Sequence, residues 1–273
     1  MSNLLSIDES QCTRCGQCAA ACPMGLVVIG TRFPRTLRAA EERCVLCGHC
    51  VAACPVQLLR HEHLPADPCS PLAPEWRGTP DALGQIIRGR RSIRHYRQDA
   101  VPKPVLLSVL DAARYAPTGM NSQSVKWTVV YDSTQVKKLS LAVIDWMREL
   151  MLQDQAVAGR YSAATLVAAW EAGLDPILRG CPHVLVACGA ENDPMAPASC
   201  MIALTTADLA AQPLGLGTCW AGFLHLAANT SPAVRQALDL PAGQVMHGGL
   251  MIGYPAETYH CVPPRKPLTV DWR

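Results

Sequence analysis

Over residues 81–273, apolar residues recur with two different periods. A spacing of three to four residues is that of one face of an α-helix. It predicts helices over 81–88, 105–115, 135–155, 163–172, 198–212 and 232–238. Short apolar runs bounded by turn residues predict strands over 125–132, 183–189, 218–223 and 244–253. Helices outnumber strands and separate them, which predicts an α+β sandwich rather than a regular doubly wound fold.

The first sixty-three residues carry a different signature, a cysteine pattern that occurs twice. Residues 12–23 read Cys-x-x-Cys-x-x-Cys-x-x-x-Cys-Pro, and residues 44–55 repeat this pattern 32 positions later. Eight of the chain's 14 cysteines belong to the two copies. Brief apolar runs predict strands at 26–29 and 57–60.

The cysteine spacing indicates two iron–sulfur clusters. A cysteine at every third position of a tight loop turns three sulfurs onto one cluster, and the fourth cysteine, before proline, binds the other cluster. The pattern therefore predicts two crossed [4Fe-4S] ligand sets. They are Cys12, Cys15, Cys18 and Cys54 for the first cluster, and Cys44, Cys47, Cys50 and Cys22 for the second.

Two other uses of the cysteines are less favoured by the sequence. A disulfide framework needs an oxidising compartment, and no secretory signal pattern opens the chain. Zinc sites use ligands in two pairs, which the closely spaced third and fourth cysteines do not match. The six remaining cysteines are expected to be small buried apolar residues: Cys69, Cys181, Cys188, Cys200, Cys219 and Cys261.

Composition narrows the class of protein. The chain has 273 residues, of which 49% are hydrophobic and 17% charged, so a sizeable packed core is expected. A formal net charge of +2 indicates no general attraction to nucleic acid or to a membrane surface. No run of eighteen apolar residues is present. We expect a cytoplasmic protein with no nucleic-acid or membrane partner.

The chain divides into three segments. Residues 1–63 form the expected cluster domain, and residues 81–273 form the α+β domain. Between them, residues 64–80 contain five prolines, a density that favours extended, semi-rigid backbone. We interpret this stretch as a stiff linker that fixes where the clusters stand relative to the second domain.

Several stretches of the second segment carry binding chemistry. Residues 90–97 concentrate four arginines, whose guanidinium groups bind phosphate through charge-assisted hydrogen bonds. Residues 116–123 form a polar loop whose backbone and amide groups could recognise the edge of a heterocycle. Glycines in residues 214–223 would let backbone approach a flat ligand. Two further cations, Arg265 and Lys266, lie near the C-terminus.

The order and spacing of these stretches resemble the FMN-binding nitroreductase family from about residue 81 to the C-terminus, and residues 1–63 look like a bacterial-type 2[4Fe-4S] ferredoxin. Together they resemble a ferredoxin–nitroreductase fusion. The resemblance implies an α+β sandwich that forms a homodimer with FMN at the subunit interface. It assigns FMN contacts to Arg90, Arg91, Ser92, Arg94, Pro117, Thr118, Gly119, Asn121, Gln123, Ala221, Gly222, Arg265 and Lys266.

The sequence departs from the family pattern at two places. Ser124 and Val125 follow the Asn-Ser-Gln loop, where the family often has proline and an aromatic residue. Ala221 stands where many members have an acidic residue. We therefore expect the substrate pocket to differ from that of the familiar nitroaromatic reductases.

The implied function is that of a flavin-dependent oxidoreductase. Its clusters would relay electrons from an external donor, ferredoxin or flavodoxin with NAD(P)H also possible, to FMN, which would reduce a small organic acceptor such as a nitroaromatic or a quinone. The alternative is an electron-transfer or redox-sensing module that passes electrons to a partner protein. No side chain is assigned as catalytic, because the flavin supplies the chemistry. Cys219 is expected to be packed rather than reactive.

Overall fold

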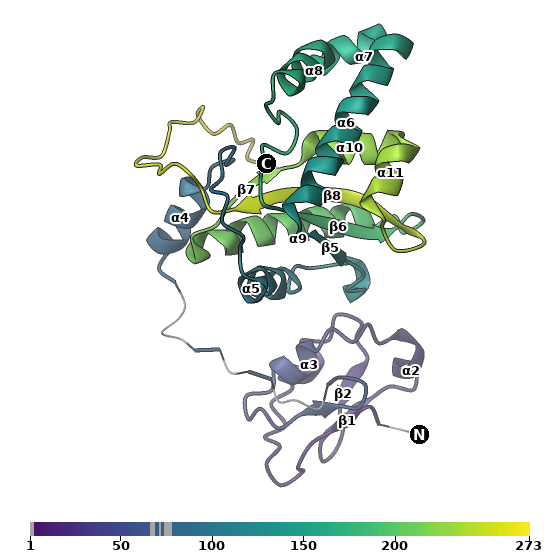
Figure 1. The fold of residues 1–273 in the computed structure, drawn as a ribbon. Coiled ribbons are helices and arrows are strands. Elements are labelled where there is room, and N and C mark those ends of the chain that lie inside the picture. The colour runs from purple at the N-terminus through teal and green to yellow at the C-terminus, as the bar shows by residue number, and fades with distance from the viewer. Residues whose placement is uncertain (1–2, 66–68, 71, 74–77) are drawn as a thin grey trace. The chain divides into compact units, whose positions relative to one another are not determined.

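The computed structural model describes residues 3–65, 69–70, 72–73 and 78–273, and Figure 1 shows its ribbon. The chain forms two compact units. The first comprises residues 1–77 with 120–122, and the second comprises residues 78–119 with 123–273. The division at residue 78 lies within the predicted linker, of which residues 66–68, 71 and 74–77 fall outside the described residues.

The first unit consists of short elements joined by tight turns. Its strands form two antiparallel pairs, β1 with β4 and β2 with β3. The elements are β1 (Leu5–Ser6), α1 (Gln17–Ala20), β2 (Val27–Ile29), β3 (Pro34–Thr36), α2 (Ala40–Arg43), α3 (His49–Ala52) and β4 (Arg60–His61). The predicted strand at 26–29 is confirmed as β2. The one predicted at 57–60 is largely wrong, because Gln57 has a left-handed backbone (φ 56°) that belongs to a turn.

The apolar core of the first unit is small and contains cysteines. One cluster of buried residues brings Cys18 and Cys54 together with Leu5, Val27 and Leu59. A second, smaller cluster consists of Leu4, Leu26 and Ala40. A domain of this size buries too little apolar surface to be very stable alone, and such domains are usually reinforced by metal sites or disulfides.

The second unit is built from longer elements. Its helices are α4 (Pro80–Gly89), α5 (Lys103–Ala113), α6 (Ser133–Gln153), α7 (Gln155–Arg160), α8 (Ala163–Glu171), α9 (Ala196–Ala211), α10 (Gly222–Thr230) and α11 (Pro232–Leu238). Its strands are β5 (Lys126–Val130), β6 (His183–Ala190), β7 (Gly217–Trp220) and β8 (Gln244–Gly253).

These elements form a three-layer sandwich around an antiparallel sheet of order β5-β6-β8-β7. Helices α6, α10 and α11 lie on one face of the sheet, and α5 and α9 lie on the other (Figure 1). Side chains of β6 alternate between the two cores: Val184 and Val186 enter the first, and Leu185 and Ala187 enter the second. Both faces of β6 are covered, which explains its apolar sequence from Val184 onward and confirms the predicted α+β sandwich.

Helix boundaries differ from the prediction where polar residues cap the chain. The helix expected over 135–155 ends at Gln153, and Asp154 starts the separate helix α7 by accepting a hydrogen bond from Val157 N (3.0 Å). The strand expected over 218–223 ends at Trp220. Helix α10 then begins at Gly222, and the apolar pattern did not predict it.

The cysteines outside the two motifs divide into two groups. Cys181, Cys188, Cys200 and Cys219 are buried, as expected. The same expectation is wrong for Cys69 and Cys261, which are exposed because they lie in irregular segments away from the helices and strands.

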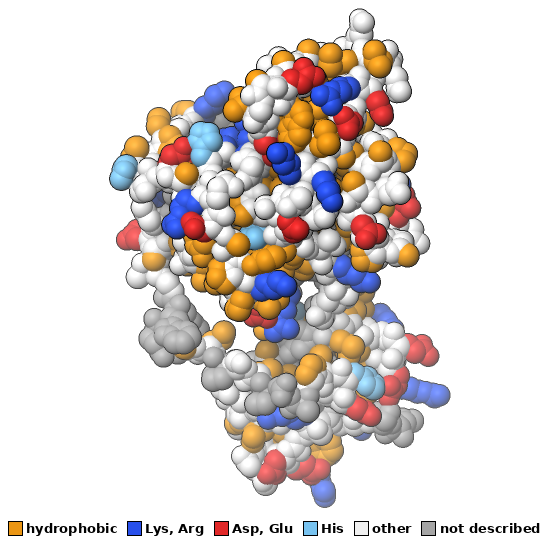
Figure 2. All heavy atoms as spheres, in the orientation of Figure 1, with side chains coloured by type: hydrophobic (Ala, Val, Ile, Leu, Met, Phe, Trp, Pro, Cys, Tyr) orange, Lys and Arg blue, Asp and Glu red, His pale blue; other side chains and the backbone are white. Residues whose placement is uncertain are grey.

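On the face of the second unit shown in Figure 2, Lys and Arg side chains are interspersed with Asp and Glu. This distribution is in keeping with the small net charge of the sequence. Across the described ranges, no helix is both long and apolar enough to cross a membrane.

The buried histidine His183 makes stability depend on pH. Its Nε2 accepts a hydrogen bond from Val101 N (2.8 Å), and its Nδ1–H donates to Tyr131 O (2.7 Å), an arrangement that requires a neutral ring. Burial lowers the pKa of His183. Because the unfolded chain binds the proton more readily, stability should fall as pH drops below about 6.5, by up to about 1.4 kcal/mol per pH unit for this group.

The measurement is urea unfolding of the wild type and of His183→Gln between pH 7.5 and 5. The variant should be less stable throughout, and its stability should vary less steeply with pH because the titrating ring is gone. Parallel pH curves for the two proteins would contradict this role of His183.

Candidate functional site

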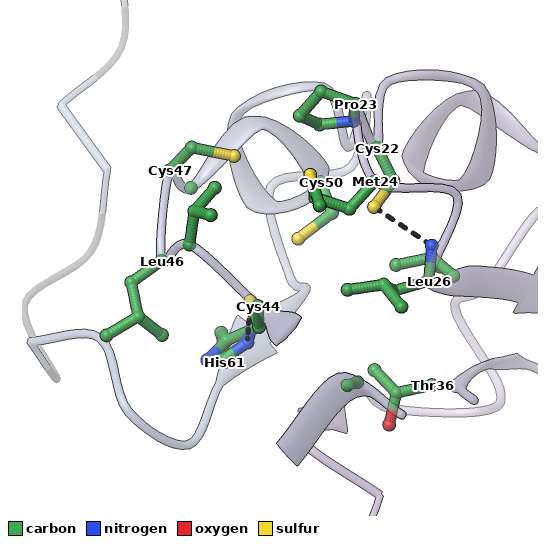
Figure 3. Close-up of a pocket in the computed structure, with 14 residues that line it drawn as sticks. Cys22, Pro23, Met24, Leu26, Thr36, Cys44, Leu46, Cys47, Cys50 and His61 are labelled. Atoms are coloured by element: carbon green, nitrogen blue, oxygen red, sulfur yellow. Dashed lines mark hydrogen bonds between the residues drawn. The ribbon is translucent and has the colours of Figure 1, made fainter. Parts of the chain in front are cut away.

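Two small cavities in the first unit are each surrounded by four cysteines. One cavity is lined by Cys22, Cys44, Cys47 and Cys50 together with apolar residues and His61 (Figure 3). We call it the Cys44 cavity. The other, the Cys12 cavity, is lined by Cys12, Cys15, Cys18 and Cys54. Each cavity therefore takes three cysteines from one copy of the repeat and the fourth from the other copy, the same crossed sets that the spacing predicts.

The two copies hold their cysteines with matching backbone turns. Arg14 and Leu46, each between the first two cysteines of its copy, have left-handed φ values of 53° and 51°. Gly16 and Gly48 follow the second cysteine with φ values of 79° and 71° and precede α1 and α3. Glycine adopts this conformation at little cost. The three cysteines of each loop line one cavity.

The residues that line each cavity suit an iron–sulfur cluster rather than a single metal ion. Burial raises the pKa of Cys18, and it raises that of Cys50 to about 11, so these thiols are protonated unless metal binds them. Within the described ranges, no three His, Cys, Asp or Glu side chains are placed to hold one metal ion. Four cysteine sulfurs around an apolar cavity are the donor set of a [4Fe-4S] cluster. The residues present therefore fit that group.

In the second unit, residues 92–97 are fixed against the edge of the sheet. Ser92 forms a β-bridge with Thr218, and Ile93 N donates to Thr218 O (2.9 Å). A side chain at Gly217 would collide with Ile93, so glycine permits this close pairing. Ile93 and Tyr96 are buried, whereas Arg94 between them is exposed. The alternation turns Arg94 away from the core.

Arg94 lies on the wall of a cavity of about 930 Å³, the largest of the cavities described here. Lys137 of α6 and Arg179 of the segment before β6 line the same cavity. None of these three cations forms an ion pair with another described residue. The walls also include Ser133, Thr134 and the aromatic ring of Trp170. A cavity of this size with converging cations and hydroxyls suits an anionic, partly aromatic ligand.

Asp175 organises the loop that presents Arg179. Its Oδ1 accepts hydrogen bonds from Ile177 N and Leu178 N, both at 3.0 Å. Its Oδ2 accepts from Gly180 N (3.1 Å) and from Ser140 Oγ of α6 (2.9 Å). These four bonds hold Arg179 in a left-handed conformation with φ 60°. The Asp175 carboxylate is therefore occupied by the loop and does not compete for the cations.

The first two predicted FMN contacts line a different hollow from Arg94. Arg90 and Arg91 line a separate hollow of about 390 Å³ with Asp208 and Glu257. Arg90 Nε lies 3.5 Å from Oδ2 of the buried Asp208, which also accepts a hydrogen bond from Thr218. Arg91 donates to the carbonyls of Arg88 and Gly89 at the end of α4. Both arginines therefore have structural partners that the sequence did not reveal.

The remaining predicted contacts fall in both units. Pro117, Thr118 and Gly119 belong to the second unit, where Thr118 Oγ1 accepts a hydrogen bond from Gln123 N (3.0 Å). Asn121 is grouped with the first unit. Arg265 and Lys266 lie in the exposed, irregular segment after β8.

The backbone near the predicted flavin N5 position offers one donor rather than two. Ala221 N already donates to Gly249 O (2.9 Å). Gly222 is the first residue of α10, where a backbone N–H has no partner within the helix. Cys219, in the preceding strand, is buried. Burial raises the pKa of Cys219, in agreement with a packed, unreactive thiol.

Sequence reasoning missed Lys137 and Arg179. Neither belongs to a motif, and they are separated by more than forty residues. The one available signal was the position of Arg179 in a turn directly before a buried strand, since binding residues are common on loops positioned by a rigid scaffold.

Comparison with known proteins identifies both parts of the chain. Residues 87–254 match the nitroreductase family, and residues 11–58 match the 4Fe-4S dicluster domain. The first match spans more than half of the chain. The chain therefore belongs to the nitroreductase family, and it is an oxidoreductase of the FMN-dependent kind that its sequence resembles, with an N-terminal iron–sulfur domain.

Individual relatives agree with this assignment. The FMN reductase [NAD(P)H] of Bacillus subtilis is 31% identical over 186 residues, which cover 64% of this chain and 68% of the relative. YfhC, a Bacillus subtilis protein of the NAD(P)H nitroreductase type, is 41% identical, but only over 59 residues that cover 22% of this chain and 29% of that protein. A crystal structure of an FMN-bound nitroreductase from Bacteroides fragilis shares the fold. It has a TM-score of 0.56 and 23% identity, and the match covers 69% of this chain and 94% of that chain.

Proposed function

We propose that this protein is a cytoplasmic oxidoreductase that takes electrons from an external donor through two [4Fe-4S] clusters to FMN and passes them to a small organic acceptor. The observation that carries the proposal is the presence, in one chain, of two four-cysteine cavities and a nitroreductase domain. An FMN domain that takes hydride directly from a nicotinamide has no need of such cavities. The cavities therefore point to delivery by single electrons.

The side chains around the large cavity would hold the flavin. Arg94, Lys137 and Arg179 would neutralise its phosphate and its electron-rich ring edge, because guanidinium and ammonium groups bind such anionic groups strongly. The backbone N–H of Gly222 would serve as the hydrogen-bond donor to the ring. Bound FMN supplies both one-electron and hydride chemistry, so no side chain needs to act as a nucleophile.

We also propose a homodimer with FMN at the subunit interface. On α9, Met201 and Ile202 are 40% and 42% exposed, an apolar surface that a second subunit would cover. The loop of Pro117, Thr118, Gly119, Asn121 and Gln123 would then contribute to the partner's flavin site, as the family resemblance implies.

The test is a comparison of electron donors under anaerobic conditions. Reduced ferredoxin or flavodoxin should reduce the bound flavin at least about tenfold faster than NADH or NADPH at equal concentration, which corresponds to about 1.4 kcal/mol in activation free energy. Equal or faster reduction by a nicotinamide would contradict the relay. An acceptor screen on the reduced protein then distinguishes an enzyme from a pure electron carrier, because only an enzyme turns over a small acceptor many times per flavin.

A further inference from the structure

His61 places a hydrogen-bond donor against one cluster ligand. The residue lies in β4 and is 7% exposed. Its Nε2 is 3.5 Å from Cys44 Sγ, and Figure 3 shows the ring turned toward this sulfur on the wall of the Cys44 cavity. Its Nδ1 accepts a hydrogen bond from His63 N (3.2 Å). Because Nδ1 is an acceptor, the ring proton must reside on Nε2 and point at Cys44.

The internal repeat offers a comparison within the same chain. A shift of 32 residues superimposes Cys44 on Cys12 and His61 on Ile29. Ile29 lines the Cys12 cavity, as His61 lines the Cys44 cavity. The side chain of isoleucine has no hydrogen-bond donor. The two cavities thus differ at this position by one buried N–H group.

The other hydrogen bonds to sulfur do not cancel this difference. Backbone N–H donors occur in both cavities, from Leu26 to Cys22 in one and from Gln17 to Cys15 in the other. The Cys12 cavity has one side-chain donor of its own, the hydroxyl of Thr13, which bonds to Cys15. Thr13 and Cys15 are both exposed, so water competes for that bond. A buried hydrogen bond is electrostatically stronger than one in contact with water.

We propose that His61 is a potential-setting residue, which raises the reduction potential of the cluster held by Cys22, Cys44, Cys47 and Cys50. This inference rests on the proposed function, which supplies the clusters. The step concerned is the gain of one electron from a one-electron donor, with no bond broken and no proton transferred. The added negative charge spreads onto the sulfurs, so the hydrogen bond from His61 becomes stronger after reduction. The reduced state is thereby stabilised.

The first experiment tests the hydrogen bond itself. Full-length protein labelled with nitrogen-15 histidine is reduced with dithionite and examined by pulsed electron paramagnetic resonance. We expect a histidine nitrogen coupled to one reduced cluster. The coupling should persist in His63→Ala, which keeps the backbone donor of residue 63, and should be lost in His61→Ile.

The second experiment measures the cluster potentials by redox titration. The variant His61→Ile copies the first half of the repeat, and Ile29→His copies the second half. His61→Ile should lower the potential of its cluster by about 59 mV, the equivalent of an about tenfold change in the one-electron equilibrium constant. Ile29→His should raise the potential of the other cluster, while His63→Ala should change neither.

The outcomes separate this inference from the proposed function. Absence of iron and acid-labile sulfide from the wild type would overturn the proposed function. Two complete clusters without histidine coupling, or with potentials unchanged in His61→Ile, would overturn the role of His61 alone. If His61→Ile fails to assemble its cluster, the presence or absence of coupling in the labelled wild type decides the matter.

Discussion

Substitution of Cys47 by serine is expected to lower the rate of flavin reduction by a one-electron donor about 100-fold or more, since even indirect changes at metal sites typically cost 10–100-fold. Cys47 lines the Cys44 cavity with three other cysteines, and serine is a poor ligand for iron that prefers thiolate. Direct chemical reduction of the flavin by dithionite should be retained, because the second unit has its own core. Stopped-flow absorbance at the flavin band measures both rates.

Cys69→Ser is the matched control for this prediction. Cys69 is exposed and lies outside both cavities, so its replacement should leave cluster content and rate unchanged. Flavin reduction that proceeds at the normal rate in Cys47→Ser would show that electrons bypass the clusters.

The crossed ligand sets can be examined in the same series. Cys22 belongs to the first copy of the repeat but lines the cavity of the second. Cys22→Ser should therefore perturb the same cluster signal as Cys50→Ser, and Cys54→Ser should perturb the signal that is lost in Cys18→Ser. If Cys22→Ser instead perturbed the same cluster signal as Cys18→Ser, each cluster would take all four ligands from one copy of the repeat. That result would overturn the crossed assignment.

The second large effect is expected at the 930 Å³ cavity. The double substitution Arg94→Gln with Arg179→Gln should weaken FMN binding about 100-fold or more, because each charged hydrogen bond contributes about 1.5–3 kcal/mol. Both side chains are exposed to the cavity and without ion-pair partners among the described residues, so their loss should affect binding more than folding. Titration of apoprotein with FMN, followed by flavin fluorescence, gives the dissociation constant.

Arg97→Gln provides a control on the same segment. Its guanidinium is paired with Asp99 at 2.6 Å and does not line the cavity. FMN affinity should stay within about threefold of the wild type, a change of less than 1 kcal/mol. If Arg91→Gln abolished FMN binding while the Arg94 and Arg179 double variant bound normally, the hollow beside Arg90 would be the flavin site instead.

Prediction from sequence succeeded where the signal is local. Helical and strand periods identified most elements of the second unit because burial of one face or of alternate residues is imprinted on a few consecutive turns. The same periods did not predict α10, because the chain passes from strand to helix within two residues there. In the first unit, the strand predicted at 57–60 was largely wrong, because a turn replaces most of it. The arginine-rich motif of residues 90–97 was recognised, but the sequence did not show that Arg90 and Arg91 line one hollow and Arg94 another.

The sequence by itself determined the α+β class and the family and predicted which cysteines share a cavity, since each depends on spacing within short stretches or on the order of motifs. Only the tertiary structure decided that Arg94, Lys137 and Arg179 share one cavity, that Arg90 is paired with Asp208, and that His61 faces Cys44. These neighbours are distant along the chain. Their proximity depends on strand register and on how helices pack, and the spacing of residues in the sequence does not record either.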